Sequence, residues 1–349
     1  MTNNKQIHRN GPAILAGISR RNLLGPLAAL MTAAVIHGTV AQEFTNSSQT
    51  SATSLNVGDV VYTDSGNAIE GGFVMKVDWQ TGQESVISKG GYLGFFGFPN
   101  GVAVGRDGQL IVANEACVLR INPATGQQTL IRDARGAAGL FWSVAVDRNG
   151  DVLVAAEKEI LRVDAVTGET HTVSSHGHLT TVLSIAVGAN NAELFVTNVR
   201  YEAAVGWVGE IIRVNPHNGR QTVISQGGYL TFLLGIAVNG DDIYVTGLKT
   251  HDDNFGVGRV TRVHARTGVQ AVVAEGGYLV RPVGIAVDAK GQLIVADPYT
   301  INSESPDLYD GGLIKIDPAT GKQTLIVRGH GSVVNPSGIA VVPDSKSGH

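Results

Sequence analysis

The sequence has 349 residues, with 26 Lys and Arg against 30 Asp and Glu, and a net charge of −4. This acidic balance argues against nucleic acid and anionic membrane as partners. Cys117 is the only cysteine, which excludes an intrachain disulfide and a cysteine-based metal site.

The first 41 residues have the features of an export signal. Lys5 and Arg9 precede an uncharged stretch, Leu23 to Ile36, that is too short to span a bilayer, and small residues suited to cleavage follow it. The run SRRNLL, which begins at Ser19, resembles a twin-arginine signal of bacteria; an ordinary Sec signal with two arginines is the alternative. The segment holds four basic and no acidic residues, so its removal changes the net charge to −8. We therefore predict an exported bacterial protein, periplasmic or extracellular.

Residues 42–56 are rich in Ser and Thr and nearly free of large apolar residues, which predicts a flexible linker. Residues 57–343 form the predicted folded domain, and residues 344–349 a disordered tail. No segment after the signal is apolar enough to span a membrane.

Short β-branched runs recur along the folded domain. One of them reads GVAV, SVAV, SIAV or GIAV and begins at positions 101, 143, 184, 235, 284 and 338. Three more runs follow each of the first five, as QLIVAN, VLRINP and QQTLIR follow Gly101. Each run is bounded by Gly, Asp, Asn or Pro, as strands are. Four short strands in about 40 to 55 residues is the period of a propeller blade.

The last GIAV, at Gly338, has no further strands after it. The start of the domain supplies three, in DVVYTD, FVMKVD and QESVIS, all before the first GVAV. We therefore predict an all-β, six-bladed β-propeller, closed by pairing the C-terminal strand into the N-terminal blade. Such closure removes the open sheet edges.

Packing explains why certain residues repeat. Gly or Ser in the first place of the GIAV run, and Ala in the third, allow inner strands to approach closely at the axis. Gly-Gly-Tyr-Leu lies between one blade's outer strand and the next blade's inner strand, where the glycines permit a chain reversal. Tyr92, Tyr229 and Tyr278 repeat in this motif, so we expect them in the interior.

The run from Pro282 to Ile326, PVGIAVDAKGQLIVADPYTINS…GGLIKIDPATGKQTLI, resembles an NHL-type blade. The whole domain resembles the six-bladed superfamily of gluconolactonase- and regucalcin-like hydrolases, strictosidine-synthase-like proteins and the peptidyl-hydroxyglycine lyase. The resemblance implies the fold and leaves activity open, because this scaffold carries enzymes and binding proteins alike.

The metal ligands of gluconolactonase-like members are a Glu, an Asn and an Asp, and here the run PNG offers only Asn100. The equivalent places in the other repeats hold no charged residue: Trp142, Leu183, Leu234, Val283 and Ser337.

The connections between second and third strands are uneven in length. They are minimal after Asn114 and Ala156, and long at 198–209, 247–258 and 297–312, with a fourth at 64–72. Long loops on one face of a rigid scaffold favour a binding site there, although propeller loops also lengthen without a function. The predicted ligand-binding residues mix aromatic and charged side chains: Arg200, Tyr201, Trp207, His251, Asp252, Tyr299 and Asp307.

A polar residue ends the second strand in four of the six blades. These residues are Asp64, Asn114, Asn198 and Asp297. Their side-chain oxygens suit Ca²⁺, so a calcium site is one interpretation, and the sequence does not otherwise identify a cofactor. The alternative is that each side chain caps the following turn by an Asx hydrogen bond.

Histidine offers a second metal hypothesis. His176 and His178 could present two nitrogens to Zn²⁺, with His330 as a third ligand. His330 belongs three blades away in a ring of six, so the interpretation as separate surface histidines is favoured.

The leading functional hypothesis is an exported, monomeric propeller that binds a small ligand or a protein partner through its long-loop face. The alternative is a metal-dependent hydrolase, of lactonase or esterase type, or a lyase of the same superfamily.

Overall fold

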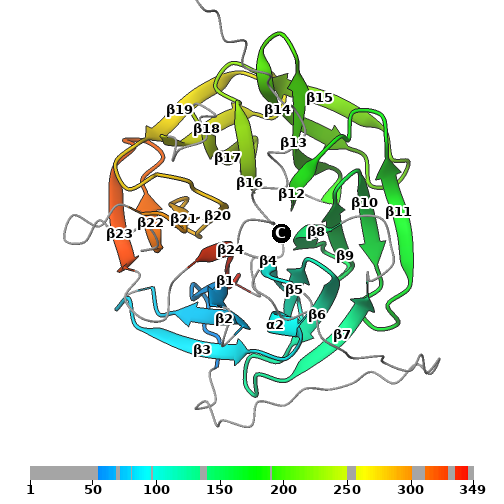
Figure 1. Cartoon of the computed structure of the whole chain (residues 1–349), viewed down its shortest axis with the longest axis vertical. Helices are drawn as coiled ribbons and strands as arrows, with labels where there is room; N and C mark the ends of the chain where they lie inside the picture. The colour runs from blue at the N-terminus through cyan, green and yellow to red at the C-terminus, as the bar shows by residue number, and fades with distance from the viewer. Residues whose placement is uncertain are drawn as a thin grey trace, which may run out of the picture. The chain divides into compact units, whose positions relative to one another are not determined.

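Six antiparallel sheets of four strands make up the computed structural model of the chain (Figure 1). The structure describes residues 54–67, 71–79, 81–95, 97–133, 140–188, 191–249, 257–300, 311–328 and 335–344. The prediction of an all-β, six-bladed propeller is confirmed. The export signal, nearly all of the linker and nearly all of the tail lie outside the described residues, so these remain predictions. Among the described residues, no helix is long and apolar enough to cross a membrane.

The blades are numbered in chain order from the N-terminus, and the strands of each are given from the axis outwards. Blade 1 contains β24 (Pro336–Val341), β1 (Val60–Asn67), β2 (Gly71–Val77) and β3 (Glu84–Lys89). Blade 2 contains β4 (Pro99–Val104), β5 (Leu110–Asn114), β6 (Cys117–Ile121) and β7 (Gln128–Asp133), and the short helix α2 (Tyr92–Phe95) precedes it. Blade 3 contains β8 (Phe141–Val146), β9 (Val152–Ala156), β10 (Glu159–Val163) and β11 (Thr170–Ser175).

The second half of the ring continues in the same order. Blade 4 contains β12 (Val182–Val187), β13 (Leu194–Glu202), β14 (Gly206–Val214) and β15 (Gln221–Gln226). Blade 5 contains β16 (Phe232–Asn239), β17 (Asp242–Leu248), β18 (Gly258–His264) and β19 (Gln270–Glu275). Blade 6 contains β20 (Gly284–Val287), β21 (Leu293–Asp297), β22 (Gly312–Ile316) and β23 (Gln323–Arg328).

The C-terminal strand closes the ring as predicted. β24 pairs antiparallel with β1, with Val341 opposite Val60 and Ile339 opposite Tyr62. The Gly338 amide also donates to the Thr63 hydroxyl oxygen at 2.8 Å. Blade 1 is therefore built from both ends of the domain.

The hydrophobic core is divided into six clusters, each between two neighbouring blades. Between blades 6 and 1, for example, Ile294 and Leu313 join Tyr62 and Met75, all at most 1 % exposed. Each blade thus buries both faces of its sheet, and an isolated blade would leave both exposed.

Small residues at the axis are required by space, as the sequence predicted. A Cβ on Gly338 would stand 2.6 Å from the Gly101 Cα, and a Cβ on Gly284 would stand 2.1 Å from the Ser337 carbonyl oxygen. Blades 3 and 4 use serine instead, and the hydroxyls of Ser143 and Ser184 lie 3.2 Å apart.

In four blades a glutamine at the start of the outer strand forms hydrogen bonds with the Gly-Gly-Tyr-Leu segment, or its equivalent, that connects the previous blade to this one. Gln128 accepts the Tyr92 amide at 2.9 Å and donates to the Gly90 carbonyl at 3.0 Å. The same contacts are made by Gln221, Gln270 and Gln323. We call these contacts the glutamine clasps. A Cβ on Gly91 would stand 2.9 Å from Gln128 Oε1, so the second glycine is needed for space as well as for its φ of +55°.

Blades 3 and 1 have other residues at the clasp position. Thr170 begins β11, and Glu84 begins β3 and accepts a hydrogen bond from the Tyr62 hydroxyl. Glutamine clasps therefore join blades 1 and 2, 3 and 4, 4 and 5, and 5 and 6.

The expectation that all three motif tyrosines are interior is wrong. Tyr92 is 4 % exposed, Tyr278 is half-buried, and Tyr229 is 47 % exposed. The Tyr229 ring lies over the Arg259 guanidinium, 5.2 Å from its centroid, on the outside of blade 5. The apolar residue of the motif that packs between blades is the leucine, since Leu93 and Leu230 are fully buried.

Candidate functional site

Polar residues of the second strands hold the chain as it enters the inner strand. Asn114 and Asp297 end their strands as predicted, whereas the prediction is wrong for Asp64 and Asn198, which lie within β1 and β13. Asn198 Oδ1 accepts the amides of Thr180 and Thr181 at 2.9 and 3.0 Å. Asp297 Oδ2 accepts the equivalent pair in blade 6, the amides of Val280 and Arg281, at 2.7 and 2.9 Å. These hydrogen bonds fix the start of each inner strand.

Two of these carboxylates also bind the turn that follows them. Asp297 Oδ1 accepts the Tyr299 amide at 2.9 Å, and Asp64 Oδ1 accepts the Gly66 amide at 2.7 Å. Asp64 accepts the Asn335 amide at 3.2 Å as well. Burial raises the pKa of the Asp297 carboxyl to about 6, against the opposing effect of its three amide donors. These contacts are of the Asx kind, and the calcium site stays a prediction.

Asn114 differs from its counterparts. Its side chain is fully buried and donates from Nδ2 to the Tyr92 carbonyl at 2.7 Å, and its Oδ1 has no hydrogen-bond partner among the described residues. The next residue, Glu115, is half-buried, and burial raises the pKa of its carboxyl while a hydrogen bond from the Phe98 backbone lowers it less.

The segment predicted as a loop from Asn198 to Gly209 is instead a hairpin. β13 and β14 pair without interruption from Leu194 opposite Val214 to Glu202 opposite Gly206. The loop prediction is therefore wrong for these residues. The strand-forming residues Val199, Tyr201 and Trp207 continue the pairing towards the tip, with Val199 opposite Gly209 and Tyr201 opposite Trp207.

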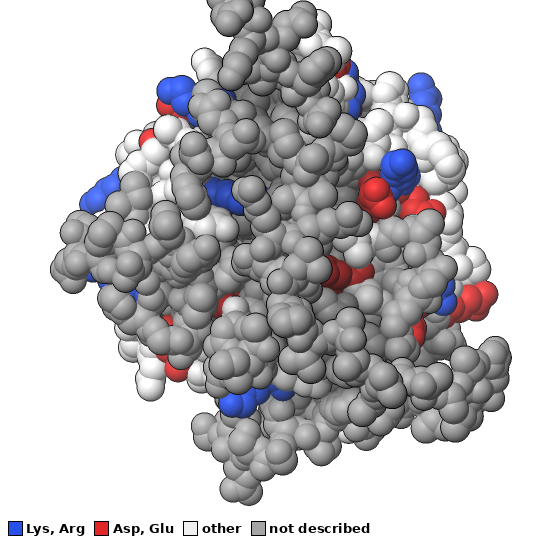
Figure 2. All heavy atoms as spheres, in the orientation of Figure 1, with Lys and Arg blue, Asp and Glu red and all other residues white. Residues whose placement is uncertain are grey.

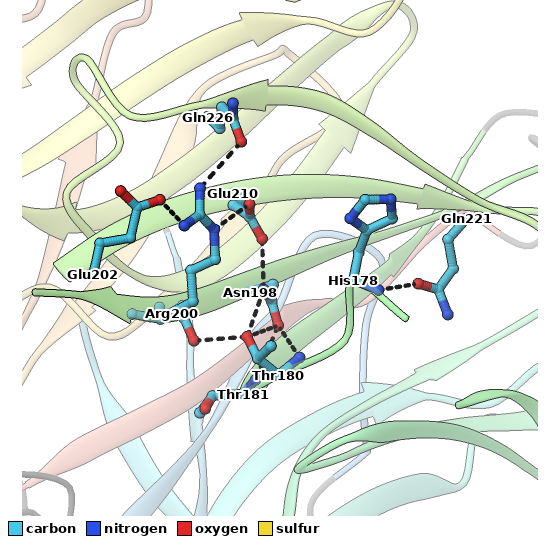
Figure 3. A network of polar contacts seen from close by, with 10 residues as sticks. His178, Thr180, Thr181, Asn198, Arg200, Glu202, Glu210, Gln221 and Gln226 are labelled. Carbon is cyan, nitrogen blue, oxygen red and sulfur yellow. Dashed lines mark hydrogen bonds and ion pairs between the residues drawn. The ribbon is translucent and has the colours of Figure 1, made fainter. Parts of the chain in front are cut away.

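A charged network holds this hairpin (Figure 3). Arg200 Nε donates to Glu210 Oε1 at 2.7 Å, and Arg200 also pairs with Glu202. Glu210 is 3 % exposed, and its other oxygen accepts Asn198 Nδ2 at 2.8 Å. Arg200 is thus linked through Glu210 to the buried side chain of Asn198 in β13, which fixes its position on the rim.

Aromatic side chains continue from the hairpin to the next blade. The rings of Tyr201 and Trp207 meet edge to face at 5.4 Å, and Trp207 meets Phe232 of blade 5 in the same way at 5.7 Å. Tyr201 is 54 % exposed, whereas Trp207 is partly buried against the cluster between blades 4 and 5. The structure therefore brings Tyr201 and Trp207 into contact, while Arg200 of the same hairpin contacts Glu202 and Glu210 instead.

Blade 5 carries a second ion-pair group at this rim. Glu275 accepts hydrogen bonds from Arg259 and from Lys249, the latter at 2.7 Å. Both cations lower the pKa of Glu275, and the hydrogen bond from Lys249 contributes most. Arg259 also donates to the Tyr229 carbonyl at 3.3 Å and lies under the Tyr229 ring.

Tyr299 lies in blade 6, in contact with the Arg281 guanidinium at 5.7 Å from its ring centroid. His251, Asp252 and Asp307 lie outside the described residues, and His330 does too. His176 has a φ of +58° and takes the place of the first glycine of the motif. Within the described ranges, no group of three or more His, Cys, Asp or Glu side chains could hold a metal ion.

Two features of the axis were not predicted from the sequence. Asn100 Nδ2 donates to the Phe141 carbonyl at 3.3 Å, which joins the inner strands of blades 2 and 3. At the far end of those strands lies a cavity of about 340 Å³, lined mainly by Val and Ala of blades 1 to 4 and by Pro343. The long connections lie at the other end of the strands, so this cavity opens on the opposite face.

Comparison with known proteins supports the fold and identifies no activity. No family model and no curated protein matches the sequence. Among solved structures, a chain of a nidogen/laminin complex is 14 % identical with a TM-score of 0.61, covering 81 % of this chain and 98 % of that chain. TolB from Acinetobacter baumannii is 14 % identical with a TM-score of 0.60, covering 82 % and 67 %. A gluconolactonase from Xanthomonas campestris is 12 % identical with a TM-score of 0.53, covering 83 % and 91 %. At these identities the likeness is one of fold, and by fold this chain is a β-propeller.

Proposed function

We propose that the chain is an exported binding protein that docks a protein partner on the rim of blades 4 and 5. The observation that carries this proposal is the distribution of exposed apolar side chains. Among the described residues, eight large apolar side chains are exposed, and four of them lie at this rim: Tyr201, Val205, Tyr229 and Val257. We call these four residues the rim patch.

The shape of the rim favours a protein over a small molecule. Small ligands bind in concave pockets, whereas the β13–β14 hairpin projects beyond its sheet. Interfaces are enriched in Tyr, Trp and Arg, and this rim holds all three, with Arg200 fixed by the buried carboxylate of Glu210. Fixed side chains lose little entropy on binding.

Surface charge supports the same choice. On the face seen in Figure 2, basic and acidic side chains lie next to each other on the described part of the surface. The rim groups are also mixed, since Arg200, Lys249 and Arg259 are each paired with a glutamate. Mixed charge suits short-range contacts with a protein better than capture of a polyanion.

A capture experiment with matched variants tests this proposal. The full-length protein, a Tyr201→Ser/Tyr229→Ser variant and a Val166→Ser/Val269→Ser control are immobilised and exposed to proteins of the compartment into which the chain is exported. Val166 and Val269 are 86 % and 65 % exposed and lie in turns of the opposite face, so the control removes as much exposed apolar surface. We expect the same partner on the wild type and the control and its loss from the rim variant. Identical captured proteins on all three would refute the proposal.

The hydrolase alternative keeps a separate test. It requires a metal, for which the candidates in the second strands are Asp64, Asn114, Asn198 and Asp297. Hydrolysis of simple lactones and aryl esters, measured with added Ca²⁺ and with EDTA, would establish it if turnover needs the metal and is lost in Asp297→Ala.

A further inference from the structure

We propose that Asn114 and Glu115 form a calcium-binding site at the turn between β5 and β6 of blade 2. Two oxygens converge there. An ideal Cβ on Gly97 would stand 3.1 Å from Asn114 Oδ1 and 2.7 Å from Glu115 Oε2, so both oxygens lie close to the same residue, where only glycine leaves them room.

The unpartnered oxygen of Asn114 points to a missing ligand. In blades 4 and 6 the equivalent oxygen accepts two backbone amides, whereas Asn114 Oδ1 is fully buried and accepts none from the described residues. A buried polar atom without a hydrogen bond costs roughly 1–3 kcal/mol, so such atoms are rare without a water, ion or ligand.

The local sequence explains why blade 2 alone differs. Five residues separate Leu93 from Pro99, which pairs with Asn114, whereas two separate Leu179 from Val182, which pairs with Asn198. The longer connection forms helix α2 and passes through Gly97 at a φ of +121°. As a result the Phe98 backbone donates to the Glu115 carboxylate and not to Asn114.

Charge favours a cation as the ligand. Glu115 forms no ion pair with any described residue, in contrast to Glu210 and Glu275 at the rim of blades 4 and 5. A carboxylate and an amide oxygen are ligands of Ca²⁺, which completes its six to eight positions with backbone carbonyls and water.

Few protein ligands imply modest affinity, of the order found in extracellular modules, about 10⁻⁴ to 10⁻³ M. This site is independent of the rim patch, so either proposal can fail without the other.

Calorimetric titration of the chelator-treated full-length chain with CaCl₂ tests the proposal, with Glu115→Gln as the main variant. Glu157→Gln is the matched control, because Glu157 occupies the same place in the turn of blade 3 but is exposed and follows Ala156. We expect one Ca²⁺ per chain for the wild type and the control, and at least tenfold weaker binding for Glu115→Gln.

A second variant guards against an effect of Glu115→Gln on folding. Asn114→Asp adds a charge to the site, and we expect it to bind Ca²⁺ more tightly than the wild type, with a larger rise of the melting temperature in CaCl₂. No binding to the wild type at 10 mM CaCl₂ (about tenfold above the weakest affinity expected) would overturn the proposal. Equal Ca²⁺ affinity of Glu115→Gln and the wild type would also overturn it. If Asp297→Ala then lost Ca²⁺ binding, the ion would be assigned to blade 6 instead of blade 2.

Discussion

Replacing Asp297 by Asn should change how the stability of the propeller depends on pH. Asp297 is fully buried and accepts three backbone amides, and burial raises its pKa from 3.8 to about 6. Between about pH 4 and 6 the folded chain therefore holds a proton at Asp297 that the unfolded chain has already released. Stability contributed at this residue falls as the pH rises through this window and is constant above it.

The magnitude follows from the pKa difference. One pKa unit corresponds to 1.36 kcal/mol, so the change from 3.8 to about 6 makes ionised Asp297 cost about 3 kcal/mol. Asn removes this cost, because a neutral amide is accommodated at the same position in blade 4, where Asn198 accepts two backbone amides. The Asn side chain also places its own N–H donors opposite the Tyr299 N–H, which then loses its acceptor. This loss lowers the stability of the variant by roughly 1–3 kcal/mol at every pH.

Urea unfolding of the wild type and Asp297→Asn at several pH values from 4 to 7 measures the difference. Subtracting the two curves cancels the other titrating groups, and the remainder should change by about 3 kcal/mol in favour of Asn as the pH rises. Asp164→Asn is a control of opposite sign, because hydrogen bonds from the Thr167 and Val166 amides lower the pKa of that exposed carboxyl. Parallel curves for wild type and Asp297→Asn would refute the reasoning.

Three further experiments, with two truncations and three substitutions, test the architecture. Deleting residues 336–349 removes the inner strand of blade 1 and should abolish cooperative unfolding. Deleting only residues 344–349 should leave the melting temperature unchanged. If both truncated proteins melted like the wild type, ring closure by β24 would be contradicted. In denaturant unfolding, Trp207→Ala should lower the free energy of unfolding by about 2 kcal/mol or more, because its ring packs against Phe232 of the next blade. Tyr229→Ala should lower it by about 1 kcal/mol or less, because Tyr229 is exposed. A larger loss for Tyr229→Ala would contradict this packing. Gly277→Ala should cost about 2 kcal/mol, because its φ is +64° and a Cβ would stand 2.9 Å from the oxygen of its clasp; an unchanged midpoint would show that the turn can relax.

The sequence was sufficient for the fold because each blade repeats the same solution. Gly at positions 101, 284 and 338 signals close packing at the axis, and the structure shows backbone atoms where a Cβ would stand. The closing strand was predictable because no further strands follow the last GIAV run, whereas three strands at the N-terminus of the domain precede the first GVAV run.

Features that break the repeat were harder to predict. The hairpin tip around Tyr201 was taken for a loop, because its strands are stabilised by pairing with each other, which the composition of either strand does not reveal. Tyr229 was assigned to the interior because it repeats, yet Arg259, a cation of another strand, holds it outside. Glu115 was missed altogether, because its setting depends on the path of a connection twenty residues earlier. Contacts of this kind join segments far apart in the sequence, and a single sequence gives no signal for them.

The glutamine clasps have a consequence for how the chain could be reordered. Each clasp depends on an unbroken connection between two blades, so a circular permutant that opens the chain at such a connection, for example between residues 226 and 232, would lose one. The connection between blades 2 and 3 leads to Thr170 and has no glutamine to lose. New termini there, with residues 344 and 54 joined by a short linker, would leave all four clasps intact. Permutants should therefore tolerate this opening better than one at any clasped connection.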